Sequence, residues 1–425
     1  MLKLSKIKIS PKPLSGCVSV PPSKSAAHRA IICAALADGI SIIQPIELSN
    51  DIKATIECMN ALGIRTTLDG NTLTVDGSTK FTNKNAVLDC GESGSTLRFL
   101  IPVAAAGNVN AEFIGHGRLP ERPIGIYLDC LPKNGVQCET KGGLPLKTSG
   151  QLKSGTFEIP GNISSQFITG LLLALPMLDG DSEIILTSPV ESVGYINMTI
   201  DIMKSFGVEI QAVKTGYKIK GNQKYTARNF TVEGDWSQAA FFMSAAALGN
   251  TITIDNLNLN SYQGDKACMD LFAQFGADIK NENGNITISP NALKGIEIDA
   301  TNIPDLVPIL AVTAAFAEGK TTITGAARLR IKESDRLKAI TDGLSRLGAD
   351  ITELPDGLII NGVEGLSGGE AEGYNDHRIV MAMAVAAIKA DSDVIISDME
   401  SINKSYPTFF EDYKKLGGSA NVILG

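Results

Sequence analysis

The chain has 425 residues, of which 38 are basic and 46 acidic, giving a net charge of −8. Its 44% hydrophobic and 20% charged residues are typical of a globular protein, and the length favours two or three domains. The acidic balance excludes a general polyanion-binding surface, so we expect no nucleic-acid partner. The longest apolar run, near "FITGLLLALPML", is too short to span a membrane.

The seven cysteines are scattered and odd in number, and the N-terminal segment has no apolar signal region. We therefore expect reduced thiols in a cytoplasmic protein. The three histidines are too dispersed for a zinc site, and neither a complete P-loop nor a GxGxxG motif occurs. We expect no metal and no organic cofactor.

The chain begins with an alternating segment, "LKLSKIKIS", which predicts a strand. A signature then recurs six times: an amphipathic helix, a glycine and a β-like run. The closing glycines are Gly63, Gly135, Gly207, Gly276, Gly348 and Gly417, at intervals of 72, 72, 69, 72 and 69 residues. Each copy begins with an Ala-rich helix and a short strand. The signature helix follows, with Gly as its C-cap, and a hairpin such as "IRTTLDGNTLTVDG" ends the copy.

Three units end near residue 232 and three more fill the rest, with "VEGDWSQ" as the crossover. The sixth unit stops at "ANVILG" without its last hairpin strand, which the N-terminal strand is expected to supply. The predicted domains are residues 20–232, and residues 1–19 together with 233–425. The expected class is α/β, with two similar domains of three repeated α/β units. The alternative is a repeat scaffold without a site.

The segment "RIKESDRLKAI", residues 330–340, interrupts this repeat. The apolar positions Leu337, Ile340, Leu344 and Leu347 form a helical stripe, which passes through Glu333 and Arg336 when extended back by one turn. The positions equivalent to Glu333 in the first and last copies are the apolar Leu48 and Ile402. A carboxylate on such a face needs a partner, a ligand or a raised pKa. The alternative is a local ion pair with Arg336.

Other exceptions gather at predicted helix starts. Near the second helices are Arg122, Ser192, Tyr195, Lys332, Arg336 and Lys404, and near the first helices are Lys24, Ser25, Arg29, Gly94, Ser95, Ser164, Ser165, Gln166, Asp305 and Arg378. Taken singly, Ser25, Ser95, Ser164 and Asp305 are also good N-caps, and an isolated Arg or Lys is ordinarily a solvated surface residue. Because equivalent helix starts share one end of each domain and attract anions, we expect an interdomain cleft for a small, multiply negative substrate. Asp305 and Glu333 would be its general acid and base, whereas His377 is expected to be structural.

The segments "PPSKSAAHRA", "ERPIG", "SSQF", "SVGY", "IPD", "RIKESDRL", "YNDHR" and "NKSYP" occur in this order along the chain. Together they resemble the 5-enolpyruvylshikimate-3-phosphate synthases, of the enolpyruvyl transferase family, over essentially the whole length. The resemblance implies two inside-out α/β barrel domains and a monomer. It also implies transfer of the enolpyruvyl group of phosphoenolpyruvate to the 5-hydroxyl of shikimate 3-phosphate, through a tetrahedral intermediate and with release of phosphate. This is a step of the shikimate pathway, toward chorismate and aromatic amino acids, and glyphosate inhibits the family.

The resemblance also implies residue roles. Shikimate 3-phosphate would be held by Ser25, Arg29, Ser164, Ser165, Gln166, Ser192, Tyr195, Asp305 and Lys332. Phosphoenolpyruvate would be held by Lys24, Gly94, Arg122, Gln166, Arg336, Arg378 and Lys404. Asp305 would take the proton from the 5-hydroxyl, and Glu333, with Lys24 nearby, would protonate the methylene carbon.

The chain departs from the family pattern at four positions: Glu92, Ser95, Phe99 and Arg328. The first three bear on the phosphoenolpyruvate pocket and on the response to glyphosate, and the last leaves one substrate contact open. The rival reading is the enolpyruvyl transferase that acts on UDP-N-acetylglucosamine, but Gly117 stands where that enzyme has its catalytic Cys. A non-catalytic scaffold of the same fold is the second rival, against which the retained Asp305 and Glu333 argue.

Overall fold

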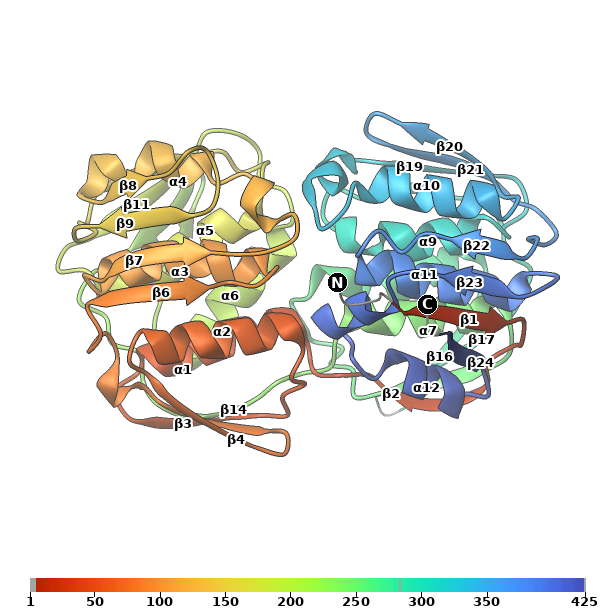
Figure 1. Ribbon diagram of the computed structural model, residues 1–425, viewed down its shortest axis with the longest axis horizontal. Helices are drawn as coiled ribbons and strands as arrows, with labels where there is room; N and C mark the ends of the chain where they lie inside the picture. Colours follow the sequence, from red (N-terminus) through yellow and green to blue (C-terminus); the bar gives the residue numbers. More distant parts are fainter. Residues whose placement is uncertain (1–4, 283, 424–425) are drawn as a thin grey trace. The chain divides into compact units, whose positions relative to one another are not determined.

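The computed structural model describes residues 5–282 and 284–423. The chain divides into two compact units, each with its own hydrophobic core. We call Pro22–Val232 the first unit, and Glu233–Gly425 together with Met1–Pro21 the second unit (Figure 1).

The strands of the described residues form six four-stranded sheets, three in each unit. The sheets share one topology, which β6 to β9 illustrate. β6 (Asn85–Asp89) lies parallel to β7 (Asn110–Ile114), β7 lies antiparallel to β9 (Leu146–Ser149), and β9 forms a hairpin with β8 (Gln137–Glu139). The predicted hairpins therefore form, and each sheet gains one further parallel strand at its edge.

The first unit holds three of these sheets and six α-helices. Its other strands are β3 (Ile40–Gln44), β4 (Arg65–Asp69), β5 (Thr72–Asp76), β10 (Thr156–Ile159), β11 (Ser182–Leu186), β12 (Ile210–Val213), β13 (Gly216–Ile219) and β14 (Asn229–Thr231). Its helices are α1 (Lys24–Leu36), α2 (Asn50–Ala61), α3 (Gly94–Ala106), α4 (Gly125–Cys130), α5 (Ser165–Ala174) and α6 (Val193–Ser205). Its 3-10 helices are η1 (Gly77–Thr79), η2 (Leu119–Glu121), η3 (Pro132–Asn134) and η4 (Leu175–Met177).

The second unit repeats this arrangement. Its strands are β1 (Lys6–Ser10), β2 (Gly16–Ser19), β15 (Ile252–Asp255), β16 (Asp278–Glu282), β17 (Asn285–Ser289), β18 (Glu297–Asp299), β19 (Lys320–Thr324), β20 (Asp350–Leu354), β21 (Gly357–Asn361), β22 (Gly369–Ala371), β23 (Val394–Ile396) and β24 (Ser419–Ile423). Its helices are α7 (Trp236–Leu248), α8 (Cys268–Phe275), α9 (Val307–Ala314), α10 (Arg336–Arg346), α11 (His377–Ala386) and α12 (Phe409–Lys415). Its 3-10 helices are η5 (Gly264–Ala267), η6 (Pro304–Leu306), η7 (Ala327–Ile331), η8 (Ala387–Lys389) and η9 (Met399–Lys404).

The N-terminal strand β1 lies between β23 and β24 and is antiparallel to both, with Ile7 opposite Ile396 and Val422. In this sheet β1 takes the place that the second hairpin strand holds in the others. β2 in turn lies parallel to β15 in a different sheet of the same unit. Residues 6–19 therefore belong to the second unit.

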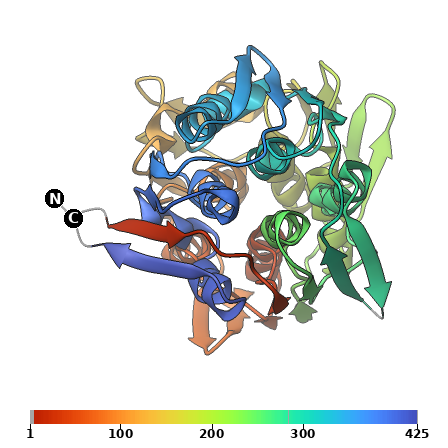
Figure 2. The ribbon, with the colours of Figure 1, turned by 90° about the vertical axis from the view of Figure 1, so that its right-hand side faces the viewer.

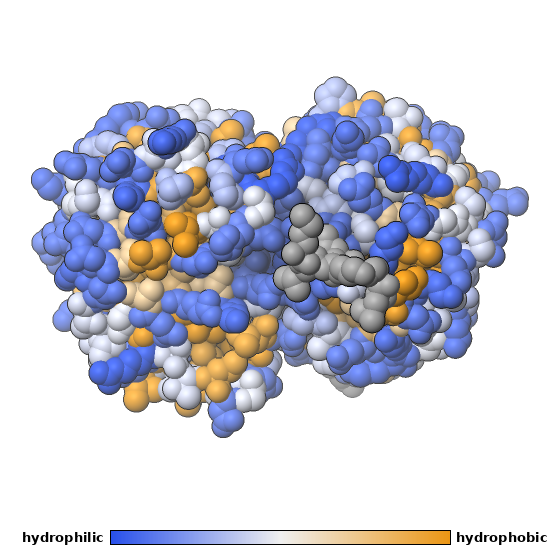
Figure 3. Space-filling model, in the orientation of Figure 1, coloured by the Kyte–Doolittle hydropathy of each residue, from blue (hydrophilic) through white to orange (hydrophobic). Residues whose placement is uncertain are grey.

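The first helix of each repeat is buried nearly all round, because its sequence is apolar or small on every face. Every residue of α7, α9 and α11 is buried, and Figure 2 shows these helices end-on, with strands around them. The second helices are amphipathic, and the predicted stripe of α10 (Leu337, Ile340, Leu344 and Leu347) is fully buried. On the face shown in Figure 3 hydrophilic residues predominate. Single apolar strand residues such as Ile40 and Val87 are exposed.

The six closing glycines all have positive φ, between 84° and 117°, as the C-cap interpretation predicted. What the sequence analysis missed is the first strand of each sheet, namely β2, β6, β10, β14, β18 and β22. These strands have only three to five residues and belong to no hairpin, so neither a long alternating pattern nor a turn motif marked them. No helix of the described residues is long and apolar enough to cross a bilayer, and all seven cysteines are free.

Candidate active site

The first predicted site residues of the first unit lie at the N-terminus of α1. Ser23 caps the helix by accepting a hydrogen bond from the Ala26 amide, so the N-cap alternative for Ser25 was wrong, and Lys24 and Ser25 lie in the first turn. Lys24 Nζ lies 2.7 Å from the Asp51 carboxylate on α2. The sequence analysis did not identify this partner, which is 27 residues away.

Arg29, one turn further along α1, is buried, with 2% of its surface exposed. It donates hydrogen bonds to Thr199 Oγ1 at 2.7 Å, to the Ser25 carbonyl at 2.7 Å and to the Tyr195 carbonyl at 3.2 Å. Its guanidinium carbon lies 5.0 Å from the centre of the Phe99 ring. Burial lowers the pKa of Arg29 to about 10, so the side chain remains a cation at neutral pH. Arg29 thus joins α1 to α6, and Phe99 packs in the core beside it.

The start of α3 is built around Gly94. Ser93 caps this helix, so the N-cap alternative for Ser95 was wrong. A Cβ on Gly94 would lie only 2.8 Å from Arg122 Nη1, because the buried Arg122 guanidinium crosses the first turn at this point. Glycine is therefore required for the close approach of Arg122 to the helix N-terminus.

Gln166 is held between two side chains. It donates to Ser95 Oγ at 2.9 Å and accepts from Arg98 Nη1 at 2.6 Å. Arg98, which the sequence analysis quoted in "GESGSTLR" but did not single out, also donates to the Pro123 carbonyl. Ser164 caps α5 through the Gln166 amide, as its N-cap alternative predicted.

The remaining predicted residues of the first unit lie at the starts of α5 and α6. Ser165 is the first residue of α5 and is buried. Ser192 lies at the N-cap position of α6 in a left-handed conformation, with φ 57°. Tyr195 lies in the first turn of the same helix.

In the second unit three carboxylates converge on Arg336, the first residue of α10. Its guanidinium donates to Asp305 Oδ1, Glu333 Oε2 and Asp376 Oδ2, each at 2.8 Å. Burial alone would lower the pKa of Arg336, but Asp376, Glu333 and Asp305 outweigh it and raise the pKa above its usual value. A cation with 2% exposure is stable here because these anions offset its desolvation.

Asp305 lies inside η6, so its N-cap alternative was wrong. Arg378 donates to its carbonyl at 3.1 Å and to Oδ2 at 3.4 Å, and Lys332 Nζ lies 3.4 Å from Oδ1. Burial alone would raise the pKa of Asp305, but Arg378, Lys332 and Arg336 together hold it well below its usual range. Asp305 is therefore ionised at neutral pH.

Glu333 does not lie on the helix that the stripe predicted. α10 begins at Arg336, with Asp335 as its N-cap, so the backward extension of the stripe was wrong. The comparison with the first copy also fails, because Leu48 is 46% exposed, whereas Ile402 is buried. The ion pair with Arg336, which was the alternative interpretation, does form, and the Glu333 side chain is 17% exposed. This leaves its carboxyl group partly accessible.

Lys404 and Arg378 complete the predicted cations of this unit, and both are buried. Lys404 Nζ donates to the Asn375 carbonyl at 2.6 Å. Tyr374 and Asn375 are consecutive residues with positive φ, 54° and 48°, directly before α11. His377 is buried in the first turn of α11, as expected for a structural residue.

Asp265 is a buried carboxylate that the sequence analysis missed. It accepts a hydrogen bond from Ser237 Oγ on α7. Burial, followed by the charge of Asp305, raises the pKa of Asp265 to about 6, although Arg378 opposes the shift. In the sequence Asp265 is part of the segment "QGD" before α8, and this segment matches no motif that would have drawn attention to it.

Of the four departures, Ser95 contacts Gln166 and Phe99 contacts Arg29, and the other two are Glu92 and Arg328. A Cβ at Gly117 would lie 2.3 Å from the Glu92 carboxylate, so a larger residue at position 117 would displace the Glu92 side chain. Arg328 donates to the Thr301 carbonyl at 2.6 Å. Among the described residues no group of three or more His, Cys, Asp or Glu side chains could hold a metal ion.

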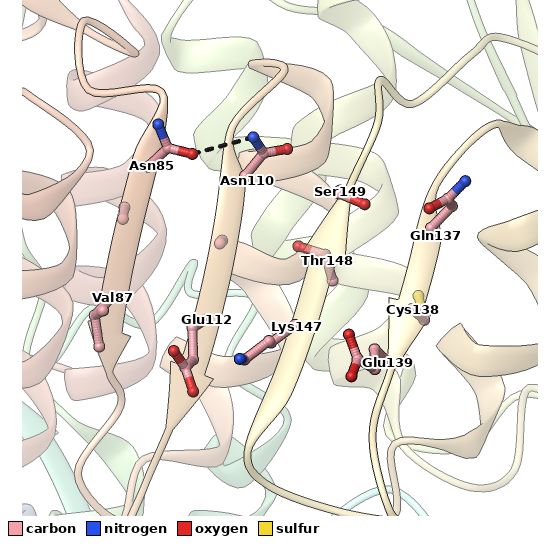
Figure 4. A pocket seen from close by; sticks show the side chains of 12 residues that line it. Asn85, Val87, Asn110, Glu112, Gln137, Cys138, Glu139, Lys147, Thr148 and Ser149 are labelled. Carbon is pink, nitrogen blue, oxygen red and sulfur yellow. Dashed lines mark hydrogen bonds between the residues drawn. The ribbon is translucent and has the colours of Figure 1, made fainter.

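The outer face of the β6–β9 sheet carries a hollow of about 530 Å³, which contains none of the predicted site residues. Figure 4 shows Glu112, Lys147 and Glu139 on adjacent strands, and a hydrogen bond of 3.1 Å from Asn110 to Asn85. These side chains are ordinary polar residues of a solvated sheet face. The predicted site residues lie elsewhere, most of them at or near helix starts.

A model of the EPSP synthase family (3-phosphoshikimate 1-carboxyvinyltransferase) matches residues 9–413. A 3-phosphoshikimate 1-carboxyvinyltransferase of Clostridium novyi is 49% identical over 428 residues, and the match covers 98% of each chain. One from Clostridium perfringens is 47% identical over 421 residues, covering 98% of this chain and 99% of the other. The solved EPSP synthase from Acinetobacter baumannii superposes with a TM-score of 0.85 at 29% identity, over 99% of this chain and 100% of the other. This similarity confirms the predicted fold class.

Proposed function

Because the chain belongs to the EPSP synthase (3-phosphoshikimate 1-carboxyvinyltransferase) family, we propose that it transfers the enolpyruvyl group of phosphoenolpyruvate to the 5-hydroxyl of shikimate 3-phosphate, releasing phosphate. The observation that carries this proposal is the match over residues 9–413, which includes both Asp305 and Glu333. Their shared contact with Arg336 supports it. The enzyme is a transferase of the shikimate pathway, and the match does not favour the UDP-N-acetylglucosamine alternative.

The polar residues described above in each unit are proposed to bind the two substrates. In the first unit Ser25, Arg29, Ser164, Ser165, Gln166, Ser192 and Tyr195 bind shikimate 3-phosphate, and Lys24, Gly94, Arg122 and Gln166 bind phosphoenolpyruvate. In the second unit Asp305 and Lys332 bind shikimate 3-phosphate, and Arg336, Arg378 and Lys404 bind phosphoenolpyruvate. Arginine and lysine suit the phosphate and carboxylate groups of these substrates.

The proposed chemistry begins with proton transfer. Asp305 takes the proton of the 5-hydroxyl, while Glu333 donates a proton to the methylene carbon of phosphoenolpyruvate. The 5-oxygen bonds to the adjacent carbon, which gives a tetrahedral intermediate. Glu333, now a carboxylate, takes a proton back from the methyl group, and the bond between the tetrahedral carbon and the phosphate oxygen breaks. Phosphate departs with the electron pair of that bond and takes up the proton held by Asp305, which restores both carboxyl groups. The cations stabilise the negative groups throughout.

Arg336 links binding to this chemistry. Without substrate its guanidinium is shared by Asp305, Glu333 and Asp376. A substrate carboxylate that takes this guanidinium displaces Glu333 from its ion pair. Glu333 is then available to carry the proton that it donates.

The test is a phosphate-release assay with phosphoenolpyruvate, with and without shikimate 3-phosphate. We expect release only when both are present, and no release at micromolar enzyme would overturn the proposal. Release with UDP-N-acetylglucosamine in place of shikimate 3-phosphate would support the rival reading. A parallel reaction with glyphosate measures the response that Glu92, Ser95 and Phe99 leave open. We expect activity without added metal or cofactor, and we propose that the protein is a cytoplasmic monomer.

A further inference from the structure

A buried chain of hydrogen bonds runs beneath the first turns of α1, α2 and α3. His28 Nδ1 lies 2.7 Å from Thr55 Oγ1, which lies 2.7 Å from Thr96 Oγ1. Thr96 Oγ1 donates to Ser93 Oγ at 2.8 Å, and Ser93 caps α3. All four side chains are buried, so each polar atom in the chain depends on its neighbour.

The donors in this chain can be assigned. Burial, together with the charges of Lys24 and Arg29, holds the pKa of His28 well below its usual value, so the imidazole is neutral and carries one N–H. Thr96 gives its hydroxyl hydrogen to Ser93, so it accepts from Thr55. Thr55 must then accept from His28 Nδ1–H, because its own hydrogen is used.

One end of the chain, Ser93, is next to Gly94, which we assign to the binding of phosphoenolpyruvate. Ser93 Oγ accepts from the Thr96 amide at 3.2 Å and so fixes the first turn of α3, where Gly94 meets Arg122. A second link runs parallel to the chain, because Lys24 and His28 are four residues apart on α1 and bond to Asp51 and Thr55, four apart on α2. These two links fix the position of Lys24 relative to the N-terminus of α3.

We propose that His28 is a positioning residue for phosphoenolpyruvate, acting through Thr55, Thr96 and Ser93 on the first turn of α3, beside the Lys24–Asp51 pair that joins the same two helices. The inference rests on the proposed function of Lys24, Gly94 and Arg122. We expect His28 to affect the binding of phosphoenolpyruvate more than the binding of shikimate 3-phosphate. The hydrogen-bond partners of Arg29, assigned to shikimate 3-phosphate, are Thr199, Thr169 and the carbonyls of Ser25 and Tyr195, none of which belongs to the chain.

The test compares His28→Leu with His28→Asn, two side chains with the same number of non-hydrogen atoms and the same branching at Cγ. The asparagine amide can place an N–H donor near the position of Nδ1, whereas leucine cannot. We expect His28→Leu to raise KM for phosphoenolpyruvate about tenfold, with kcat and KM for shikimate 3-phosphate within about twofold of wild type. His28→Asn should stay within about twofold of wild type in all three constants.

A stability control separates positioning from damage to the fold. Tyr225→Phe removes a buried hydrogen bond to the Leu173 carbonyl in the same unit, outside the proposed site. It should lower Tm without raising KM for phosphoenolpyruvate. If His28→Leu does not fold, Thr55→Val against Thr55→Ser tests the same chain, because serine keeps the hydroxyl and valine does not.

The outcomes distinguish the inference from the function on which it rests. No phosphate release by the wild-type enzyme overturns the proposed function. An active wild type with equal KM values in the leucine and asparagine variants overturns only the role of His28. A parallel rise of both KM values in His28→Leu overturns it as well, because the effect would then not be specific to phosphoenolpyruvate.

Discussion

At the scale of single residues, Glu333 and Glu353 give a matched test of the proposed acid. Each is a glutamate paired with an arginine, at 2.8 Å and 2.6 Å respectively, but only Glu333 is assigned to the reaction. We predict that Glu333→Gln lowers turnover by about a hundredfold or more, because an amide cannot donate the proton. Glu353→Gln should leave turnover within about twofold of wild type, as expected for a partly exposed ion pair. Phosphate release and thermal unfolding measure both, and unchanged turnover in Glu333→Gln would leave that residue as an ion-pair partner of Arg336.

Asp265 predicts a pH dependence of stability. Its pKa is about 6 in the folded protein and 3.8 in its ordinary state, so its contribution to stability is present below about pH 4 and is lost as the pH rises through about 6. Asparagine keeps an acceptor for Ser237 and does not titrate. We predict that the free energy of unfolding of Asp265→Asn, relative to wild type, rises between pH 4 and pH 7 by up to about 3 kcal/mol. Urea unfolding at several pH values measures the difference, and a difference that does not change with pH would contradict the assignment.

Residue-level reasoning singled out cations and carboxylates such as Lys24, Glu333 and Arg336, but not the side chains that hold them. Glu333 and Arg336 stood out in the sequence, although the helix begins three residues after Glu333. Lys24 pairs with Asp51 and Gln166 with Arg98, at sequence separations of 27 and 68 residues. Side-chain pairs between different helices leave no periodic pattern in a single sequence, and such partners therefore had to come from the structure.

At the scale of elements, the start of α3 gives a test of close packing. Alanine is a better helix former than glycine, but its Cβ at position 94 would lie 2.8 Å from the Arg122 guanidinium. We predict that Gly94→Ala raises KM for phosphoenolpyruvate about tenfold or more by displacing Arg122, without loss of thermal stability. Gly125→Ala, at the start of α4, is the control, because nothing lies within 4 Å of its Cβ. Equal kinetics in the two variants would show that the position of Arg122 does not matter.

The strand β1 gives a test of how an element remote in sequence stabilises the last sheet. Ile9 is fully buried and pairs with Val394 and Ala420, whereas Lys8 points to the other face and forms an exposed ion pair with Asp393. We predict that Ile9→Ala lowers the free energy of unfolding by about 2–5 kcal/mol. Lys8→Ala should change it by about 0–1 kcal/mol. Denaturant unfolding compares the two, and equal effects would contradict a central place for β1 in the core.

The prediction of helices and strands succeeded where a sequence pattern extended over many residues or recurred in several copies. The stripe of α10 and the glycine after each second helix occupied enough residues to be recognised and to be compared between copies. The predicted N-caps of α1 and α3 were wrong by two positions, because Ser23 and Ser93 cap these helices and not Ser25 and Ser95. Several polar residues in a row could each cap a helix, and only the backbone geometry selects one of them.

At the scale of the whole molecule, the sixfold repeat could be predicted because one pattern recurs at a nearly constant interval. Six copies of one sheet topology bear it out in the described residues. The repeat does not say which copies carry chemistry. Asp305, Glu333 and Arg336 lie in the fifth copy and Arg122 in the second, and only the departures from the common pattern mark them.

The proposed reaction needs residues from both units, and this gives the last prediction. Arg122→Ala removes a cation from the first unit, and Glu333→Gln removes the acid from the second. If the protein acts as a monomer, an equal mixture of the two variants should release phosphate no faster than the sum of their separate rates. Wild type mixed with Glu333→Gln is the control, and it should keep the full rate of the wild-type fraction. A mixture rate well above the sum would mean that units of different chains complement one another, which would contradict a monomeric enzyme.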